Sequence, residues 1–235
     1  MATLRLIVMS RAPVPGLTKT RLIPALGAEG AAAFHAACLM DLLAEADTWR
    51  REWAGRGAAF GLTLSITPPG SEAAFRAAGV DWPAHANVAA QRGDTLGERM
   101  RDALREGLAV AERVLLVGCD LPLLTWAHWE AAARALDDQE AVFGPAADGG
   151  YYLIGVRRPA AGRAWEGMLE AGDGGGSTVL ERALAQARHL GLSVAQIATL
   201  PDADTPEDLR RVLDHPLAKL RSARRSLTLL RERSG

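Results

Sequence analysis

Short apolar runs alternate along the chain with longer amphipathic segments, and clusters of Gly, Pro, Asp and Ser separate them. The apolar runs predict strands at 4–9, 62–66, 113–118, 141–143, 151–156 and 194–198. The amphipathic segments predict helices at 29–46, 71–78, 95–110, 125–136 and 178–190, and one more that begins at Thr205. Because strands that alternate with helices form parallel sheets covered on both faces, we expect a three-layer α/β fold with a mostly parallel sheet.

The domain organisation follows from where this alternation ends. Residues 1–215 carry the whole pattern and predict a single domain. From Pro216 on, basic residues and leucines at helical spacing predict a basic, amphipathic C-terminal tail over 216–235. We interpret its basic face as solvated; contact with acidic lipids or another polyanion is the alternative.

Composition and charge narrow the function classes. The chain has 235 residues, 49% of them hydrophobic, and its 27 Lys and Arg against 28 Asp and Glu give a net charge of -1. This balance argues against a general nucleic-acid binder, so we expect no specific nucleic-acid partner and any anion site to be local. The two cysteines, Cys38 and Cys119, are too few for a disulfide framework and fit a reducing cytoplasm. We also expect no signal peptide and no membrane span.

The five histidines show no metal-ligand spacing, and we interpret them, like the scattered tryptophans, as packing or surface residues.

A stiff, basic loop follows the first predicted strand. Residues 11–22 contain two prolines and Gly16, then Lys19 and Arg21. The loop matches neither a Walker P-loop nor a GxGxxG fingerprint. It lies where ligands of open α/β sheets bind, beyond the carboxyl end of a strand, and its cations suit a di- or triphosphate. The alternative is a surface loop with two solvated cations.

Acidic residues follow two further predicted strands. Asp120 stands directly after the strand at 113–118, and Asp204 follows the strand at 194–198. A carboxylate at such a position can bind a divalent cation that bridges phosphate oxygens, so Asp120 and Asp204 would share one metal if their strands are close. The alternative for Asp120 is a turn cap. Asp208 is predicted to be structural, because Thr205 and Asp208 form a helix cap.

A fourth cluster connects the strands at 141–143 and 151–156. Asp148 is followed by Gly149 and Gly150, which permit positive φ and a close approach of the backbone to a ligand. The arrangement can present Asp148 to a ligand, or it can be no more than a tight hairpin turn.

Taken together, these segments resemble one family, the bacterial glycosyltransferase-A (GT-A)-like proteins of the nucleotide-diphospho-sugar transferase superfamily. The matching segments are PVPGLTKTRL (13–22), GDTLGERM (93–100), GCDLPLL (118–124), GPAADGGYYLIG (144–155) and DADTPEDL (202–209). The resemblance implies a Rossmann-like α/β/α domain that holds a nucleotide over the strand ends. It extends to 2-phospholactate and molybdenum cofactor guanylyltransferases.

The resemblance also implies roles for individual residues. Gly16, Lys19 and Arg21 would bind the nucleotide phosphates. Asp120 and Asp204 would hold Mg²⁺ or Mn²⁺.

By looser analogy, Gln91 and the segment around Gly97 would lie by the base or ribose. Asp148, Gly149 and Gly150 would face the acceptor.

Three functions remain open. In a glycosyltransferase, the metal steadies a nucleoside diphosphate that leaves a sugar, and Asp148 is the candidate base. In a nucleotidyltransferase, a phosphorylated small molecule attacks a nucleoside triphosphate and pyrophosphate leaves, with Lys19 and Arg21 on the leaving group. The third is a nucleotide-binding module without activity, since a fold alone does not prove catalysis. We expect a metal-dependent transferase, with Lys19, Asp120 and Asp148 as its catalytic residues.

Overall fold

The computed structural model describes residues 3–55, 57–158, 165–170, 179–220 and 224–234. A seven-stranded sheet forms its centre, with the strand order β3-β2-β1-β4-β6-β5-β7. The strands are β1 Leu4–Arg11, β2 Phe60–Thr67, β3 Ala86–Ala90, β4 Arg113–Gly118, β5 Ala141–Pro145, β6 Tyr151–Arg157 and β7 Val194–Gln196. Only β6 runs against the others, since it pairs antiparallel with both β4 and β5 while the remaining pairs are parallel. The predicted α/β class and mostly parallel sheet are confirmed.

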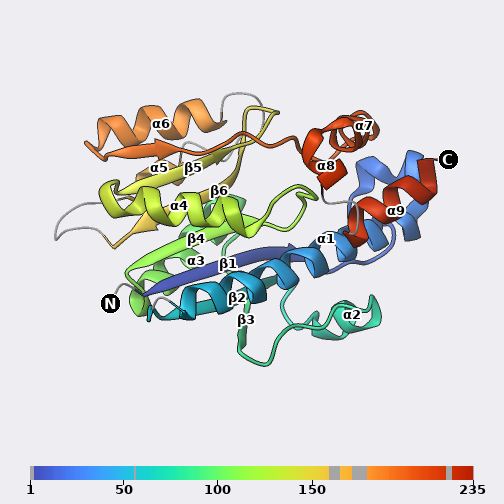
Figure 1. Ribbon diagram of the computed structural model, residues 1–235, viewed down its shortest axis with the longest axis horizontal. Coiled ribbons are helices and arrows are strands. Elements are labelled where there is room, and N and C mark those ends of the chain that lie inside the picture. The colour runs from blue at the N-terminus through green and yellow to red at the C-terminus, as the bar shows by residue number, and fades with distance from the viewer. Residues whose placement is uncertain (1–2, 56, 159–164, 171–178, 221–223, 235) are drawn as a thin grey trace.

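Helices cover both faces of the sheet (Figure 1). They are α1 Ile23–Ala54, α2 Glu72–Ala77, α3 Leu96–Val110, α4 Trp126–Asp138, α5 Gly167–Glu170, α6 Val179–His189, α7 Pro206–Asp214, α8 Pro216–Leu220 and α9 Arg225–Ser234, with a 3₁₀ turn at Thr20–Leu22. Alternate residues of β1 enter the two cores, Leu6 and Val8 packing with α1 and α4, and Ile7 and Met9 with α3, α5 and α6. The period-2 alternation of a strand therefore builds the predicted three layers.

The helix caps follow the sequence. Thr95 and Glu98 form a capping box at the start of α3, and Thr205 and Asp208 form one at the start of α7. The backbone amides of Thr95 and Asp94 donate to the Glu98 carboxylate and hold its pKa below the usual value. Asp208 is thus structural, as predicted. The first residue of the helix predicted at 178–190 lies outside the described residues.

The structure differs from the predicted elements at several places, and the short helix α5, the strand β3 and the length of α1 are among them. The strand β3 is absent from the prediction, because Ala86–Ala90 contains a single β-branched residue and forms only as an edge partner of β2. The helix α1 extends past the predicted end at residue 46, where Trp49 and Trp53 continue its buried face. Trp49 packs against Trp129 of α4 with ring centroids 5.8 Å apart.

By length and composition, the segment Thr20–Ala54 is the one described helix that could cross a membrane, and 61% of its apolar window is buried inside the protein. That burial is typical of a core helix, and α1 packs between the sheet, α4 and α9.

The C-terminal segment packs on the domain (Figure 1). Leu227 and Leu230 of α9 are buried in the same core as α1. The Asp41 carboxylate of α1 accepts hydrogen bonds from the backbone amides of Arg225 and Ser226, so it caps α9. The boundary between a domain at 1–215 and a tail at 216–235 stays a prediction.

Arg224 is buried, in contrast to the solvated basic face predicted for the tail. Its guanidinium donates to the Pro122 carbonyl oxygen at 2.6 Å and pairs with Glu45 of α1 at 2.8 Å. Pro122 follows Asp120 by two residues, so the C-terminal segment is bonded to the loop that carries Asp120.

Candidate active site

The three predicted charged residues meet at the carboxyl end of the sheet. The Lys19 ammonium lies 3.0 Å from Asp120 Oδ2 and 2.7 Å from Asp204 Oδ1, and it also donates to the Ala203 carbonyl oxygen at 3.0 Å. Asp120 directly follows β4, whose neighbour β1 leads into the loop that bears Lys19. The edge of the sheet where open α/β proteins bind ligands therefore carries a lysine bridged between two aspartates.

The backbone of the loop fixes the direction of Lys19. Lys19 has φ 52° and ψ 44°, a left-handed conformation that is uncommon for residues other than Gly, Asn and Asp. Next to it, the buried Thr18 hydroxyl donates to the Ala12 carbonyl oxygen at 2.6 Å and ties the loop across its base. The loop therefore accepts local backbone strain to aim the ammonium at the two carboxylates.

The charges of this cluster stabilise one another. The Lys19 side chain is only 5% exposed, and although burial disfavours its charge, Asp120 and Asp204 raise its pKa above the ordinary value. Burial likewise disfavours the ionised form of Asp120, but Lys19 and His35 outweigh it and hold the pKa of that carboxyl well below its usual range. The cluster therefore contains an ionised lysine beside an ionised Asp120 carboxylate.

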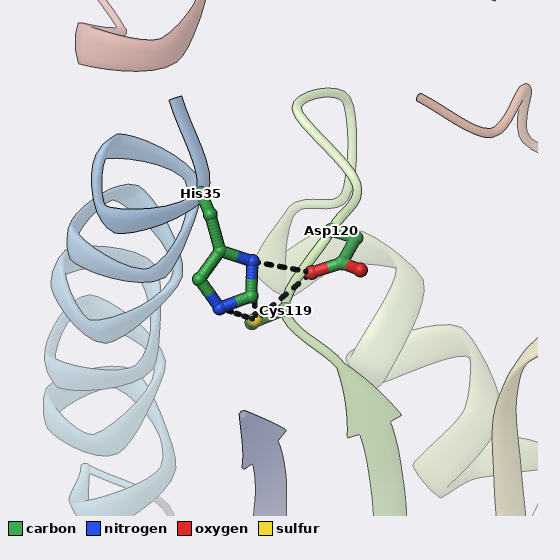
Figure 2. Close-up of side chains that lie close together, drawn as sticks. All are labelled: His35, Cys119 and Asp120. Atoms are coloured by element: carbon green, nitrogen blue, oxygen red, sulfur yellow. Dashed lines mark hydrogen bonds and ion pairs between the residues drawn. The ribbon is translucent and has the colours of Figure 1, made fainter. Parts of the chain in front are cut away.

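His35 corrects the interpretation of the histidines as packing or surface residues. From the buried face of α1, its Nδ1 lies 3.1 Å from Asp120 Oδ1, and Cys119 Sγ lies 3.5 Å from its Nε2, as Figure 2 shows. The Nε2 atom is also 2.9 Å from the Arg11 carbonyl oxygen, which can only accept, so this nitrogen donates. His35 thus connects the end of β1 to the aspartate that follows β4.

The ring of His35 carries a proton on both nitrogens. Burial disfavours a charged ring, but the adjacent Asp120 carboxylate outweighs it and raises the pKa of His35 well above its ordinary value. The thiol of Cys119 is neutral, because burial raises its pKa. His35, Cys119 and Asp120 are close enough together to be considered as metal ligands. Both ring nitrogens face oxygen acceptors, the Arg11 carbonyl and the Asp120 carboxylate, so His35 and Cys119 form a hydrogen-bonded support for Asp120.

Asp120 and Asp204 fit a divalent cation better. Both supply carboxylate oxygens, the ligands that Mg²⁺ and Mn²⁺ prefer, and their side chains are 43% and 50% exposed, which leaves room for water ligands. One ammonium nitrogen already contacts both carboxylates within 3.0 Å, so a single small cation can lie between them. A metal at this position would compete with the Lys19 ammonium for the two carboxylates.

Two cavities meet at this bridge. A smaller one of about 250 Å³ is lined by cationic side chains of the loop and α1, among them Arg11, Lys19, Arg21 and His35. A larger one of about 500 Å³ lies on the other side of Asp120 and Asp204 and contains Asp148. The aspartate pair is therefore shared by a basic and an acidic cavity.

The predicted phosphate- and base-binding residues are spread more widely. Gly16 makes an exposed turn with φ 79°, and Gly97 lines the larger cavity. Gln91 lines a third cavity of about 410 Å³ between α3 and the sheet, and its amide donates to the Ser65 carbonyl oxygen at 2.9 Å. Gly97 therefore lines the same cavity as Asp120 and Asp204, whereas Gln91 does not. The base- or ribose-binding roles of these two residues stay predictions.

The segment that carries Asp148 is both a hairpin turn and part of the larger cavity. It joins the antiparallel strands β5 and β6, and Gly149 has φ 90°. The Asp148 carboxylate accepts from the Gly150 amide at 2.7 Å, and the Asp148 amide donates to Asp202 Oδ2 at 3.1 Å. The two readings of this segment are compatible.

Asp202 is a further acidic residue that lines the larger cavity. In the sequence it belongs to the segment 202–209 and has no role of its own there. Burial first, and then the charge of Asp148, raise the pKa of Asp202 to about 6. Neither Asp202 nor His35 stands out locally in the sequence: Asp202 precedes a helix cap, and His35 is one polar residue in an apolar helix. The one usable signal for His35 is a histidine on a helix face that is otherwise buried.

The middle of the chain matches one family model. Residues 54–169 match the model described as "Uncharacterized protein conserved in bacteria (DUF2064)". No curated protein matches the chain.

Solved structures share the fold. A Desulfovibrio desulfuricans G20 protein, provisionally named a nucleotide-diphospho-sugar transferase, is 27% identical, with a TM-score of 0.82 over 100% of this chain and 96% of that one. The 4-diphosphocytidyl-2C-methyl-D-erythritol synthase of Anaerococcus prevotii is 12% identical, with a TM-score of 0.57 over 94% of this chain and 96% of that one.

A third structure contains ligands. Glucosyl-3-phosphoglycerate synthase of Mycobacterium tuberculosis, bound to Mn²⁺, UDP and glucosyl-3-phosphoglycerate, is 12% identical, with a TM-score of 0.51 over 99% of this chain and 80% of that one. The chain therefore has the nucleotide-diphospho-sugar transferase fold, which is found in both glycosyl- and nucleotidyltransferases.

Proposed function

We propose that this protein is a metal-dependent glycosyltransferase that uses a nucleoside diphosphate sugar. The observation that carries the proposal is the position of Asp120 and Asp204 between two cavities of opposite charge. A diphosphate leaving group needs cations, and a hydroxyl acceptor needs a carboxylate base, so the two cavities suit the two halves of such a reaction.

The basic cavity suits the diphosphate. Arg11 and Arg21 are exposed at its rim, where their guanidinium groups can each bind two phosphate oxygens. The Lys19 ammonium is bonded to both aspartates. By moving toward a phosphate bound in this cavity, it can bring one unit of positive charge to that phosphate. The left-handed backbone of Lys19 holds the side chain at this position before any ligand arrives.

Asp120 and Asp204 are the residues that would hold Mg²⁺ or Mn²⁺. A bound divalent cation supplies positive charge against the charge that develops on the departing diphosphate. The complex of glucosyl-3-phosphoglycerate synthase with Mn²⁺ and UDP, in a protein of the same fold, supports this assignment.

Asp148 is the proposed base. Its carboxylate lies in the larger cavity, exposed to solvent, and is oriented by the Gly150 amide at 2.7 Å. As the acceptor oxygen bonds to the anomeric carbon, the acceptor hydroxyl gives its proton to Asp148. The bond from that carbon to the diphosphate oxygen breaks, and its electron pair leaves with the nucleoside diphosphate. This is the inverting course.

Nucleotidyl transfer is the second candidate. The pairing of Lys19 with Arg21 in one loop favours it, since both can face the pyrophosphate that leaves a nucleoside triphosphate. The shared fold with 4-diphosphocytidyl-2C-methyl-D-erythritol synthase also supports this reading.

A product assay on the purified protein with Mn²⁺ separates the candidates. One set offers UDP-, GDP-, dTDP-, CDP- and ADP-sugars with pooled hydroxyl acceptors, and the other offers nucleoside triphosphates with sugar phosphates. We expect release of a nucleoside diphosphate in the first set, lost in Asp120→Asn and kept in Asp138→Asn, an exposed aspartate at the end of α4.

Two outcomes contradict the proposal. Pyrophosphate release in the second set alone supports nucleotidyl transfer. If no product forms in either set while the protein still binds nucleotide, the result supports a nucleotide-binding module without activity.

A further inference from the structure

The two cavities beside the aspartate pair differ in which charges line them. The described residues that line the larger cavity include Asp120, Asp148, Asp202 and Asp204 but no Lys, Arg or His. The smaller cavity holds the cationic side chains, with Lys19 bonded to both shared aspartates. Asp148 and Asp202, which Lys19 does not pair with, therefore face an entering anion without a cation in the described lining of the larger cavity.

The segments that carry Asp148 and Asp202 are hydrogen-bonded to each other. The Asp148 amide donates to Asp202 Oδ2 at 3.1 Å, which brings the acidic segments after β5 and β7 side by side. The hairpin holds the Asp148 carboxylate in place through the Gly150 amide. A phosphate or carboxylate on a ligand in this cavity would therefore meet two acidic side chains of its own charge.

Another part of the lining of the same cavity is apolar. It is formed by Met9 and Leu116 from the sheet, Met100 from α3, and Ile154 from β6. Methionine side chains adapt to irregular apolar ligands, and apolar surface favours a ligand with an apolar part.

We propose that the acceptor of this enzyme is a hydroxyl compound without an anionic group, neutral or cationic, whose apolar part lies on the methionine wall. The inference rests on the proposed function, since it assigns the larger cavity to the acceptor. It excludes sugar phosphates and phosphoglycerate-like acids from that cavity. In this respect the chain differs from glucosyl-3-phosphoglycerate synthase, whose bound product carries a phosphate.

The test uses ligand binding and needs no turnover. Three probes share a phenyl ring and differ in charge: phenyl β-D-glucoside, phenyltrimethylammonium and phenyl phosphate. The protein has five methionines, and ¹³C-methyl labelling reports on each by NMR. Met9 and Met100 line the cavity, and Met100→Leu assigns one of their signals.

We expect the glucoside and the ammonium probe to shift the Met9 and Met100 signals, with dissociation constants at least about tenfold below that of phenyl phosphate. In the double variant Asp148→Asn/Asp202→Asn this discrimination falls below about threefold, because the amide oxygens keep the hydrogen bonds and lose the charge. The two single variants give intermediate values, and Asp138→Asn gives the wild-type value.

Two results overturn the inference. One is phenyl phosphate binding at Met9 and Met100 as tightly as the glucoside. The other is the absence of any shift at these methyls with all three probes at millimolar concentrations. Failure of the proposed function looks different: no nucleoside diphosphate is released from any sugar nucleotide, while the order of probe affinities is kept.

Discussion

Lys19 Nζ lies 2.7 Å from Asp204 Oδ1, although 185 residues separate the two along the chain. The contact exists because β1 and β7 are both followed, at the same edge of the sheet, by a loop that carries a charge. The ammonium also reaches Asp120, so a lysine stands at the position that the proposed function assigns to a metal. Binding of a divalent cation and binding of phosphates that attract Lys19 should therefore assist each other.

The first prediction concerns the Lys19 ammonium that lies between Asp120 and Asp204. Lys19→Met removes one positive charge from between two carboxylates, so the affinity for Mn²⁺ without nucleotide should rise by about tenfold. Release of nucleoside diphosphate should fall at the same time, because the diphosphate loses a cation. Electron paramagnetic resonance of free Mn²⁺ measures the first effect. Lys219→Met, an exposed lysine of α8, is the control and should change neither. Unchanged Mn²⁺ affinity in Lys19→Met would show that the ammonium does not compete with the metal.

The second prediction concerns the proposed base. Asp148→Asn keeps the hydrogen bond from Gly150 but cannot take a proton, so kcat should fall by about 10²-fold or more. The KM for the sugar nucleotide should stay within about threefold, because the proposed function places the phosphates in the smaller, basic cavity, which Asp148 does not line. Steady-state kinetics with a saturating acceptor gives both values. A rise in KM without loss of kcat would assign Asp148 to binding instead.

The third prediction concerns His35, which supports Asp120 from α1. His35→Leu removes the buried hydrogen bonds that the ring makes to the Arg11 carbonyl oxygen and to Asp120, and it should lower the free energy of unfolding by about 2 kcal/mol. Urea denaturation measures this. His85→Leu, an exposed histidine, is the matched control and should stay within about 0.5 kcal/mol of the wild type. Equal stability of the two variants would mean that these hydrogen bonds contribute nothing net.

The fourth prediction concerns the C-terminal segment. Arg224→Met removes the buried ion pair with Glu45 and the hydrogen bond to the Pro122 carbonyl oxygen, and it should destabilise the protein by about 3 kcal/mol. Arg225→Met, the exposed neighbour, should cost less than about 1 kcal/mol. Truncation after residue 215 should be at least as damaging as Arg224→Met, because it uncovers α1. A stable fragment 1–215 would instead support a separate tail.

The sequence predicts the fold through elements whose pattern is strong. The unbroken apolar run of β4 and the capping boxes of α3 and α7 are local signals, and the structure keeps them close to their predicted bounds. The edge strand β3 has no such pattern and depends on its partner β2. The buried role of Arg224 likewise arises from tertiary contacts, with Pro122 and Glu45, that a charge count along the tail does not reveal.

The candidate site likewise contains residues that the sequence pattern identifies and residues that only the folded structure identifies. Lys19, Asp120 and Asp204 each follow a strand, and topology alone brings such residues to one edge. His35 lies 84 or more residues away from Cys119 and Asp120, on a helix face with no local mark of function. Asp202 becomes distinctive only beside Asp148. Chemistry that depends on contacts between distant segments is visible only in the folded chain.

The most direct test of the account is Mn²⁺ binding with and without a nucleoside diphosphate, followed by electron paramagnetic resonance. UDP, GDP, CDP, ADP and dTDP are each added to the wild type, Asp120→Asn and Asp204→Asn. The account predicts that at least one nucleotide raises the Mn²⁺ affinity of the wild type by about tenfold or more, and that each variant loses this gain. An equal gain in both variants, or none with any of these nucleotides, would contradict a shared metal and nucleotide site at Asp120 and Asp204.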